Sequence, residues 1–178
     1  MASINIHGGH NPKGKVACGA VGLLNESEQD RIIKDKVMTI LKAKGHTVYD
    51  CTVDNGVSQS DVLKKIVSKC NANTVDLDIS IHFNASNGSG NGTEVWVYST
   101  ASKALTAAKN IVNSIASLGF KNRGVKYSKS LYVLKNTKSP ALLIECCFVD
   151  SEVDYNKYDA DKMATAIANA IIKSLWYI

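Results

Sequence analysis

The stretch over residues 75–88 alternates apolar and polar side chains and then breaks into a loop. Apolar residues occupy every second position from Val75 to Ile81, which is the period of a β-strand. The sequence then reads Asn-Ala-Ser-Asn-Gly over residues 84–88, a turn-forming cluster. His82 is therefore expected where a buried strand opens into a loop, the kind of place where ligand sites gather in open α/β sheets. An imidazole there binds a metal or transfers a proton, or it serves equally well as a purely structural hydrogen-bonding group.

Strands alternate with amphipathic helices along the rest of the chain. Apolar periodicity predicts helices over about 27–44, from residue 58 or 60 to about 71, over about 105–118, and over about 163–175. Strands are predicted over residues 3–6, 46–49, 75–82, 92–98, 131–134 and 141–145. Asn25 or Ser27 is expected to cap the first helix, and Gly45 to end it. This alternation indicates one α/β domain, with a mostly parallel twisted sheet of about six strands and helices on both faces.

Three more polar residues are expected at comparable places. His10 lies in a Gly-rich loop after the first strand, and it is preferred over nearby His7 because the loop frees it from the strand. Glu26 falls in the first turn of a helix, where a carboxylate also has a plain structural role facing the helix dipole. Glu145 ends a continuous apolar run, and a charge at the end of a buried strand is costly unless something compensates it.

These residue types suggest metal-assisted hydrolysis. Two histidines and one carboxylate are a catalytic zinc set with an open fourth position, and His10, His82 and Glu26 supply such a set. A further glutamate, Glu145, can then accept a proton from the attacking water. A glycosidase that uses two carboxylates is an alternative, but it leaves two strand-end histidines without a role.

The chain resembles the zinc-dependent N-acetylmuramoyl-L-alanine amidases of the amidase-3 type, found in bacterial autolysins and phage endolysins. Five short motifs carry the resemblance, in the order of the family and at the expected ends of elements. They are Gly9-His10, Gly19-Ala20 with Asn25-Glu26, Ser-Ile-His-Phe-Asn-Ala over residues 80–85, Asn-Arg-Gly-Val-Lys over 122–126, and Pro-Ala-Leu-Leu-Ile-Glu over 140–145.

The resemblance implies one zinc ion per chain, held by His10, Glu26 and His82, with Glu145 as the catalytic acid/base. It also implies hydrolysis of the amide bond between N-acetylmuramic acid and L-alanine in peptidoglycan. Two departures from the family concern the pocket wall and the substrate preference. Cys-Cys-Phe follows Glu145 where the family has a small polar residue and a glycine, and the helix before residue 71 lacks an arginine.

Three polar residues are candidates for contact with substrate. Asn84 begins a loop rich in Asn, Ser and Gly that either touches sugar or peptide or is a plain connector. Arg123 and Lys126 either receive a carboxylate of the stem peptide or lie on a solvated surface.

Size, charge and cysteine content narrow the class of protein. A chain of 178 residues with 45% hydrophobic and 21% charged residues is typical of one globular domain, here a catalytic domain over residues 1–178 without a wall-binding module. The net charge of +5 favours polyanionic partners such as a cell wall, and no nucleic-acid motif accompanies it. Five scattered cysteines are an odd number, which favours free thiols over a disulfide framework. Cys146 or Cys147 is a weaker candidate for a nucleophile.

The expected partner is peptidoglycan, with no membrane and no nucleic acid, and the expected state is a monomer. No apolar stretch is long enough to span a membrane and no signal peptide is visible, which predicts a protein made in the cytoplasm that acts on the wall after release. Two alternatives to the amidase stay open. One is a zinc peptidase of the stem peptide, and the other is a non-catalytic wall-binding module that kept the fold.

Overall fold

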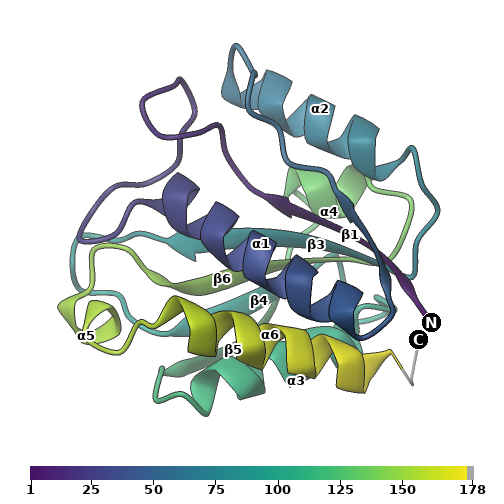
Figure 1. Cartoon of the computed structure of the whole chain (residues 1–178). Coiled ribbons are helices and arrows are strands. Elements are labelled where there is room, and N and C mark those ends of the chain that lie inside the picture. Colours follow the sequence, from purple (N-terminus) through teal and green to yellow (C-terminus); the bar gives the residue numbers. More distant parts are fainter. Residues whose placement is uncertain (176–178) are drawn as a thin grey trace.

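The computed structural model describes residues 1–175, in which one six-stranded sheet forms the centre of an α/β domain (Figure 1). The strand order is β2-β1-β3-β6-β4-β5, and every neighbouring pair is parallel except β4 and β6, which are antiparallel. The strands are β1 (Ser3–Gly8), β2 (Thr47–Asp50), β3 (Leu77–Asn84), β4 (Thr93–Val97), β5 (Asn122–Tyr127) and β6 (Ala141–Phe148). The predicted mostly parallel sheet is therefore confirmed, and β4 and β5, which are parallel to each other, run opposite to the other four strands.

Helices cover both faces of the sheet, as the sequence predicts. They are α1 (Glu26–Ala43), α2 (Gln59–Cys70), α3 (Leu105–Ala116), α4 (Tyr132–Asn136), α5 (Glu152–Tyr155) and α6 (Ala160–Ser174). The side chain of Asn25, rather than that of Ser27, caps α1 by accepting a hydrogen bond from the N–H of Glu28, and Ser58 caps α2 in the same way. Gly45 follows α1 with a φ of +84°, a conformation that glycine adopts without strain.

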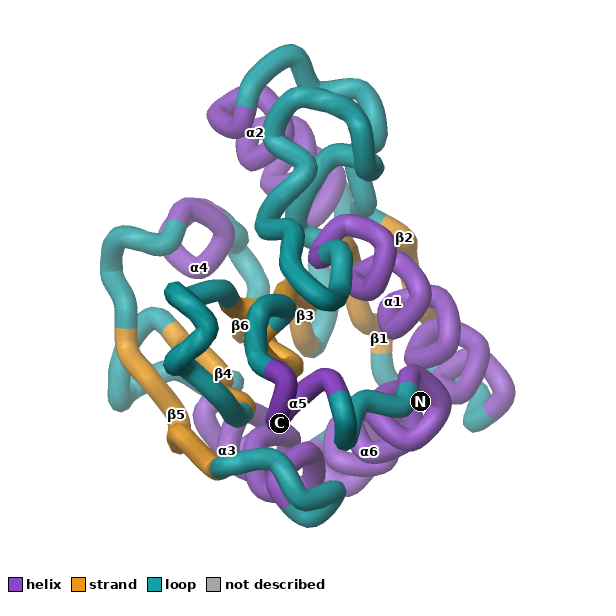
Figure 2. Tube along the Cα trace, turned by 90° about the vertical axis from the view of Figure 1, so that its left-hand side faces the viewer, coloured by secondary structure: helices purple, strands orange, loops and turns teal. Residues whose placement is uncertain are grey.

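The two faces of the sheet carry different side chains. Helices α1, α3 and α6 pack on one face over a continuous apolar core, whereas α2 and α4 lie on the other (Figure 2). Strand β3 shows the alternation clearly, because Ile79 and Ile81 belong to the large core while Ser80 and His82 point to the opposite face. We call the first the apolar face. We call the second the polar face, although a smaller apolar cluster also packs there under α2 and α4.

One predicted strand is wrong and one observed strand was missed. Residues 131–134 form the start of α4, where Val133 and Leu134 are buried against α2 while Tyr132 and Lys135 are exposed. A short apolar run does not distinguish a strand from a buried helical turn. Strand β5 was missed because it lies at the sheet edge, is half-buried and contains mostly polar residues.

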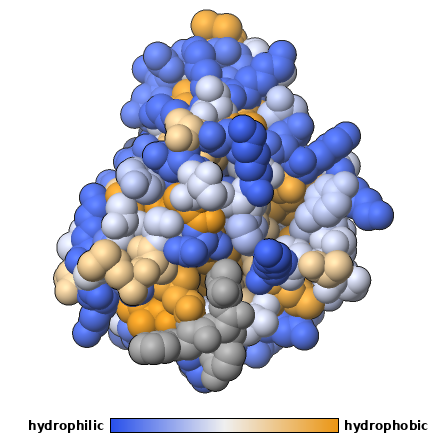
Figure 3. Space-filling model, turned by 90° about the vertical axis from the view of Figure 1, so that its right-hand side faces the viewer, coloured by the Kyte–Doolittle hydropathy of each residue, from blue (hydrophilic) through white to orange (hydrophobic). Residues whose placement is uncertain are grey.

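The end of the molecule where the chain begins is mostly hydrophilic. Hydrophilic residues dominate the upper part of this surface, and the hydrophobic ones lie mainly in its lower part (Figure 3). Within residues 1–175, no helix combines the length and the apolar character that a membrane span needs.

Candidate metal centre

Three side chains from three separate elements converge where β1 and β3 end. His10 lies in the loop after β1, Glu26 is the first residue of α1, and His82 lies near the end of β3. One donor atom from each residue lies within 4.8 Å of the others. Oε1 of Glu26 is 3.1 Å from Nε2 of His10 and 3.1 Å from Nδ1 of His82. The structure thus brings together the three residues that the sequence singled out.

Hydrogen bonds from the backbone hold Glu26 in this position. Its Oε2 accepts from the N–H of Ala20 at 2.8 Å, and its Oε1 accepts from the N–H of Phe83 at 3.2 Å. Burial alone raises the pKa of Glu26, but the hydrogen bonds with His10 and His82 outweigh burial and keep the pKa well below its usual range. Glu26 is therefore ionised near neutral pH.

The two histidines respond differently to this carboxylate. Burial lowers the pKa of His82 below its usual value, and the contact with Glu26 only partly opposes this. Burial also acts to lower the pKa of His10, but the hydrogen bond with Glu26 outweighs it, so that the pKa is raised. His82 is thus held as the neutral imidazole, the form that binds metals.

Two glycines make room for the cluster. A Cβ atom on Gly9 would lie 1.8 Å from Cε1 of His82, so the ring occupies the space that any other side chain needs. A Cβ atom on Gly19 would lie 2.6 Å from Oε2 of Glu26 and 2.9 Å from Cδ2 of His10, and this glycine also has a φ of +77°. The glycines of the sequence motifs are therefore required by close packing around His10, Glu26 and His82.

Glu145 lies beside this cluster on the polar face. In the sheet register it is paired with His82 on one side and with Glu94 on the other. Its Oε2 atom is buried and has no hydrogen-bond partner among residues 1–175. Burial, helped by the negative charges of Glu26 and Glu94, raises the pKa of Glu145 to about 8. Several other buried side-chain oxygens in the described chain also lack a partner, so it is the position of this carboxyl group beside the cluster, together with its raised pKa, that makes Glu145 a candidate functional residue.

The donor set fits a zinc ion. Imidazole nitrogen and carboxylate oxygen are zinc ligands, and three protein donors leave a fourth position open. The unpartnered Oε2 of Glu145 is consistent with chemistry at that open position. A small cleft of about 130 Å³ adjoins the two histidines, and its other walls are mostly apolar side chains from α2, α4 and β6.

Two of the candidate substrate contacts meet at a residue that the sequence did not single out. Asn84 Nδ2 donates to Oε1 of Glu94 at 3.2 Å, and Arg123 Nε donates to Oε2 of Glu94 at 2.7 Å. Lys126 is paired with Trp96 in the sheet register and has no hydrogen-bond partner within the described part of the chain. A signal for Glu94 was present, because it is an acid inside a predicted strand, beside the apolar positions Val95 and Val97.

The loop after Asn84 is tied to the segment that follows β6. Asp150 Oδ2 accepts from the N–H of Ser86 at 2.8 Å and from the N–H of Gly88 at 3.1 Å. Asp154 Oδ2 accepts from the N–H of Gly92 at 2.8 Å. These carboxylates fix the course of the loop beside the candidate site.

The other two histidines and the five cysteines do not belong to the cluster. Burial lowers the pKa of His7 to about 3, and its Nδ1 faces the carbonyl of Gly8. His46 accepts a hydrogen bond from the N–H of Ala2. All five cysteines are free thiols. Burial raises the pKa of Cys146 and of Cys147 well above the usual range, so neither is a thiolate nucleophile near neutral pH.

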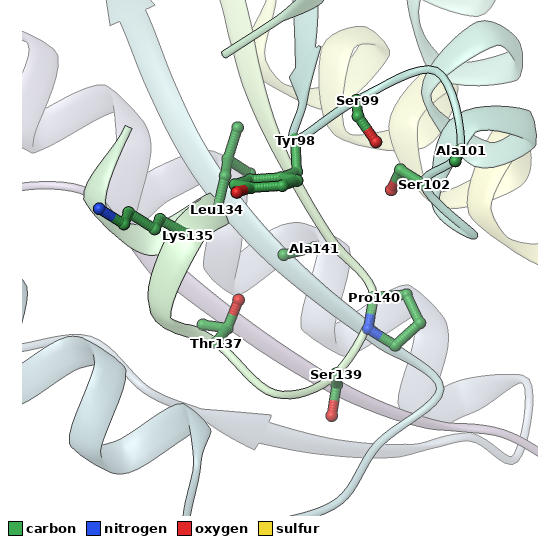
Figure 4. A pocket seen from close by; sticks show the side chains of 10 residues that line it. All are labelled: Tyr98, Ser99, Ala101, Ser102, Leu134, Lys135, Thr137, Ser139, Pro140 and Ala141. Atoms are coloured by element: carbon green, nitrogen blue, oxygen red, sulfur yellow. The ribbon is translucent and has the colours of Figure 1, made fainter. Parts of the chain in front are cut away.

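A separate recess of about 310 Å³ lies between α4 and the loop that follows β4 (Figure 4). It opens near the amino end of β6, away from Glu145, and Tyr98, Lys135 and Pro140 are among its walls. The described residues that line it include no histidine and no carboxylate. This recess is therefore distinct from the candidate metal centre.

The fold and the cluster together define an α/β protein with a candidate metal centre at the carboxyl ends of its central parallel strands. The chain belongs to the Amidase_3 family, described as N-acetylmuramoyl-L-alanine amidase, whose model matches residues 4–176.

The chain is also similar to curated proteins and to solved structures. The chain is 33% identical to the N-acetylmuramoyl-L-alanine amidase LytC of Bacillus subtilis over 179 residues, which covers 96% of this chain and 35% of LytC. An uncharacterized 38.4 kDa protein of Clostridium perfringens is 38% identical over 97% of the chain, and the chain spans 51% of that relative. Among solved structures, the catalytic domain of the CD27L endolysin targeting Clostridia Difficile has a TM-score of 0.89 at 30% identity, covering 97% of this chain and 98% of that one. The chain spans about half the length of the first curated relatives that it matches.

Proposed function

We propose that this chain hydrolyses the amide bond between N-acetylmuramic acid and L-alanine in peptidoglycan, and that it depends on zinc. The observation that carries the proposal is the convergence of His10, Glu26 and His82 beside the unpartnered oxygen of Glu145. Membership of the amidase family and the likeness to LytC support the choice of bond. The site of action in this proposal is the cell wall, because the bond belongs to peptidoglycan.

His10, Glu26 and His82 hold one zinc ion per chain in this proposal. When bound, zinc supplies a Lewis acid that polarises a carbonyl group and makes water a stronger nucleophile near neutral pH. The backbone N–H groups of Ala20 and Phe83 orient Glu26 toward the ion, because both its oxygens are hydrogen-bonded to them.

Glu145 acts as the general acid/base. It accepts a proton from the attacking water and returns it to the nitrogen of L-alanine as the amide bond breaks. A carboxyl group whose pKa is raised to about 8 is close to the operating pH, where general acid/base groups are most effective. Asn84, Arg123 and Lys126 lie along the substrate on the side of β4 and β5.

Digestion of purified cell wall tests the proposal and separates it from the alternatives. Mass spectrometry of the released fragments is expected to show new N-terminal L-alanine, which defines an amidase. New reducing ends would indicate a glycosidase, cuts within the stem peptide would indicate a peptidase, and wall binding without any fragments would indicate a binding module. Each of these three results contradicts the proposal.

Metal analysis tests the dependence on zinc. Purified protein is expected to contain about one zinc per chain, to lose activity in a strong chelator, and to regain it when zinc is restored. A His10→Ala variant should lose zinc, whereas His46→Ala, which removes a histidine distant from the cluster, should keep it. Full activity of wild type in a strong chelator would overturn the zinc part of the proposal.

A further inference from the structure

A row of polar residues crosses the sheet from the candidate metal centre to the edge strand β5. His82 on β3 is paired with Glu145 on β6, and Glu145 is paired with Glu94 on β4. Residues paired directly across neighbouring strands have their side chains on the same face. Arg123 on β5 extends the row, since its Nε donates to Oε2 of Glu94 at 2.7 Å.

Glu94 is the central residue of this row and is almost completely buried. Its Oε1 accepts from Nδ2 of Asn84 and from Nε1 of Trp96, each at 3.2 Å. Its Oε2 accepts from Arg123. A buried carboxylate is costly unless it is paired and hydrogen-bonded. Both oxygens of Glu94 meet this condition, and through them Glu94 joins Asn84, Trp96 and Arg123.

The Nε atom of Arg123 is hydrogen-bonded within the protein, whereas its two terminal nitrogens have no partner in the described part of the chain. Nε is bound to Glu94, and the guanidinium group lies over the ring of Phe148 with its central carbon 5.0 Å from the ring centre. Within residues 1–175, neither Nη1 nor Nη2 has a hydrogen-bond partner, and 32% of the side chain is exposed. The group therefore presents the outer edge of a planar fork, the geometry that receives a carboxylate through two parallel hydrogen bonds.

The charges near this fork favour an anion. Glu94 balances Arg123, and Lys126 on the same strand adds a further positive charge without a hydrogen-bond partner among the described residues. Neighbouring strands lie about 4.8 Å apart. The guanidinium group therefore lies roughly 5–10 Å from the carboxyl group of Glu145, since one strand separates their two strands.

The proposed substrate has a carboxyl group at that distance. After L-alanine, the stem peptide continues with D-glutamate joined through its γ-carboxyl group, which leaves the α-carboxyl group as a free carboxylate or as a carboxamide. Two extended residues span about 7 Å. A stem peptide that leaves the reacting amide across β6 and β4 therefore brings this group to Arg123.

We propose that Arg123, positioned by Glu94, receives the free α-carboxylate of the second stem-peptide residue, so that the enzyme prefers stems carrying a carboxylate there over stems carrying a carboxamide. The inference rests on the proposed amidase function. In it Arg123 determines specificity, and Glu94 is a positioning residue that acts through Arg123.

Two soluble substrates test the preference: N-acetylmuramoyl-L-alanyl-D-isoglutamate and the corresponding D-isoglutamine compound. The wild type is expected to have a kcat/KM roughly 10- to 100-fold higher for the carboxylate, mainly through KM, as one or two charge-assisted hydrogen bonds predict. Arg123→Ala should bring the two values together, and Arg123→Lys should keep only part of the preference. Lys129→Ala removes an exposed positive charge from the loop after β5 and should leave the ratio unchanged.

The ratio of the two substrates also isolates the role of Glu94, because effects on the chemical step cancel in it. Glu94→Ala should lower the ratio, since Arg123 loses its anchor. Glu94→Gln retains an oxygen that can accept from Arg123 and should restore at least part of the ratio. A Glu94→Ala protein that turns over more slowly but keeps the full ratio would show that Glu94 has no positioning role.

Binding provides a second readout that does not depend on turnover. Calorimetric titration of the zinc-loaded Glu145→Ala protein with both compounds should show the same preference, which Arg123→Ala added to that protein should remove. Equal cleavage of both compounds by the wild type overturns this inference and leaves the amidase function standing. If the wild type cleaves neither compound, the amidase function is refuted. In that case the titration alone tests the carboxylate preference, and equal binding of the two compounds overturns it.

Discussion

The two faces of the sheet carry out different tasks with residues that are neighbours in the sequence. On β6, Ile144 is completely buried in the core under α1, α3 and α6, while Glu145 points to the polar face. On β3, Ile81 and His82 are divided in the same way. The apolar face stabilises the fold through close packing, and the polar face holds ionisable groups at set distances. A strand thus keeps the stabilising and the reactive residues one position apart.

Polar side chains on the polar face gather in two places. Far from the candidate metal centre, Nδ2 of Asn5 donates to Oδ1 of Asp78 at 2.7 Å and to the carbonyl of Cys70 at 2.9 Å, which joins β1, β3 and α2, while Oδ1 of Asn5 and Oδ2 of Asp78 have no partner in the described chain. Near the cluster, both oxygens of Glu26 are hydrogen-bonded, but Oε2 of Glu145 has no partner in the described chain. An unpartnered oxygen alone therefore does not mark a reactive group, and what distinguishes Glu145 is its position beside His10, Glu26 and His82.

The largest expected effect is a loss of activity without a loss of folding, caused by a substitution on the polar face. Replacing Glu145 with alanine should lower the rate of amide hydrolysis by about 10²–10⁴, because it removes the general acid/base. The fold and the zinc content should be unchanged, since no core side chain is lost. Turnover assays with circular dichroism and metal analysis check this. Near wild-type turnover by a folded, zinc-loaded variant would refute the assignment.

A substitution at the neighbouring residue, Ile144, should lower stability and leave activity unchanged. Ile144→Ala leaves a cavity in the core of the apolar face and should lower the free energy of unfolding by about 2–5 kcal/mol. At a temperature where the variant is still folded, its kcat should remain near that of the wild type. Denaturant unfolding and turnover measured on the same samples test the pair. A large loss of kcat at full folding would mean that the two faces are coupled more tightly than their packing indicates.

A smaller effect is expected from the glycine that makes room for the cluster. Gly19 and Gly14 have similar positive φ angles, +77° and +82°, but only a Cβ atom on Gly19 meets Glu26 and His10. Alanine at either position costs about 1–2 kcal/mol of backbone strain. Only Gly19→Ala should also weaken zinc binding, by roughly 10- to 100-fold, the usual effect of disturbing the groups that orient metal ligands. Competition with a chromogenic chelator measures it, and equal zinc affinities of the two variants would contradict the prediction.

The smallest effect concerns the stability of the metal-free protein against pH. Burial raises the pKa of Glu145 from 4.5 to about 8, so the folded protein retains a proton that the unfolded chain has released over this interval. The group therefore lowers the free energy of unfolding as pH rises from about 4.5 to about 8. Glu145→Gln removes this loss and should be more stable than wild type above the interval, with little difference below it. Urea unfolding in chelator at several pH values tests this, and a constant difference across the range would count against a buried proton on Glu145.

Local sequence was informative wherever a strand or helix has a clear apolar period. The alternation over residues 75–81 and the apolar run before Glu145 located β3 and β6, and the loops after β1 and β3 located His10 and His82. The period failed where burial is partial or the element is short. Edge strand β5 has no apolar stripe. Helix α4 has only a few residues, and its apolar side is buried because it packs against α2.

By itself, the sequence determined the class of fold and most of the elements, and it predicted the three candidate donor residues and Glu145, because these depend on the period of burial and on residue type. Only the tertiary structure decided that β4 lies between β6 and β5 and runs antiparallel to β6, that Gly9 and Gly19 border the ring of His82 and the carboxylate of Glu26, and that Glu94 joins Asn84 to Arg123. These facts depend on the pairing of strands that are distant along the chain. Local periodicity carries no information about which strands become neighbours, and so it cannot place side chains from different strands beside one another.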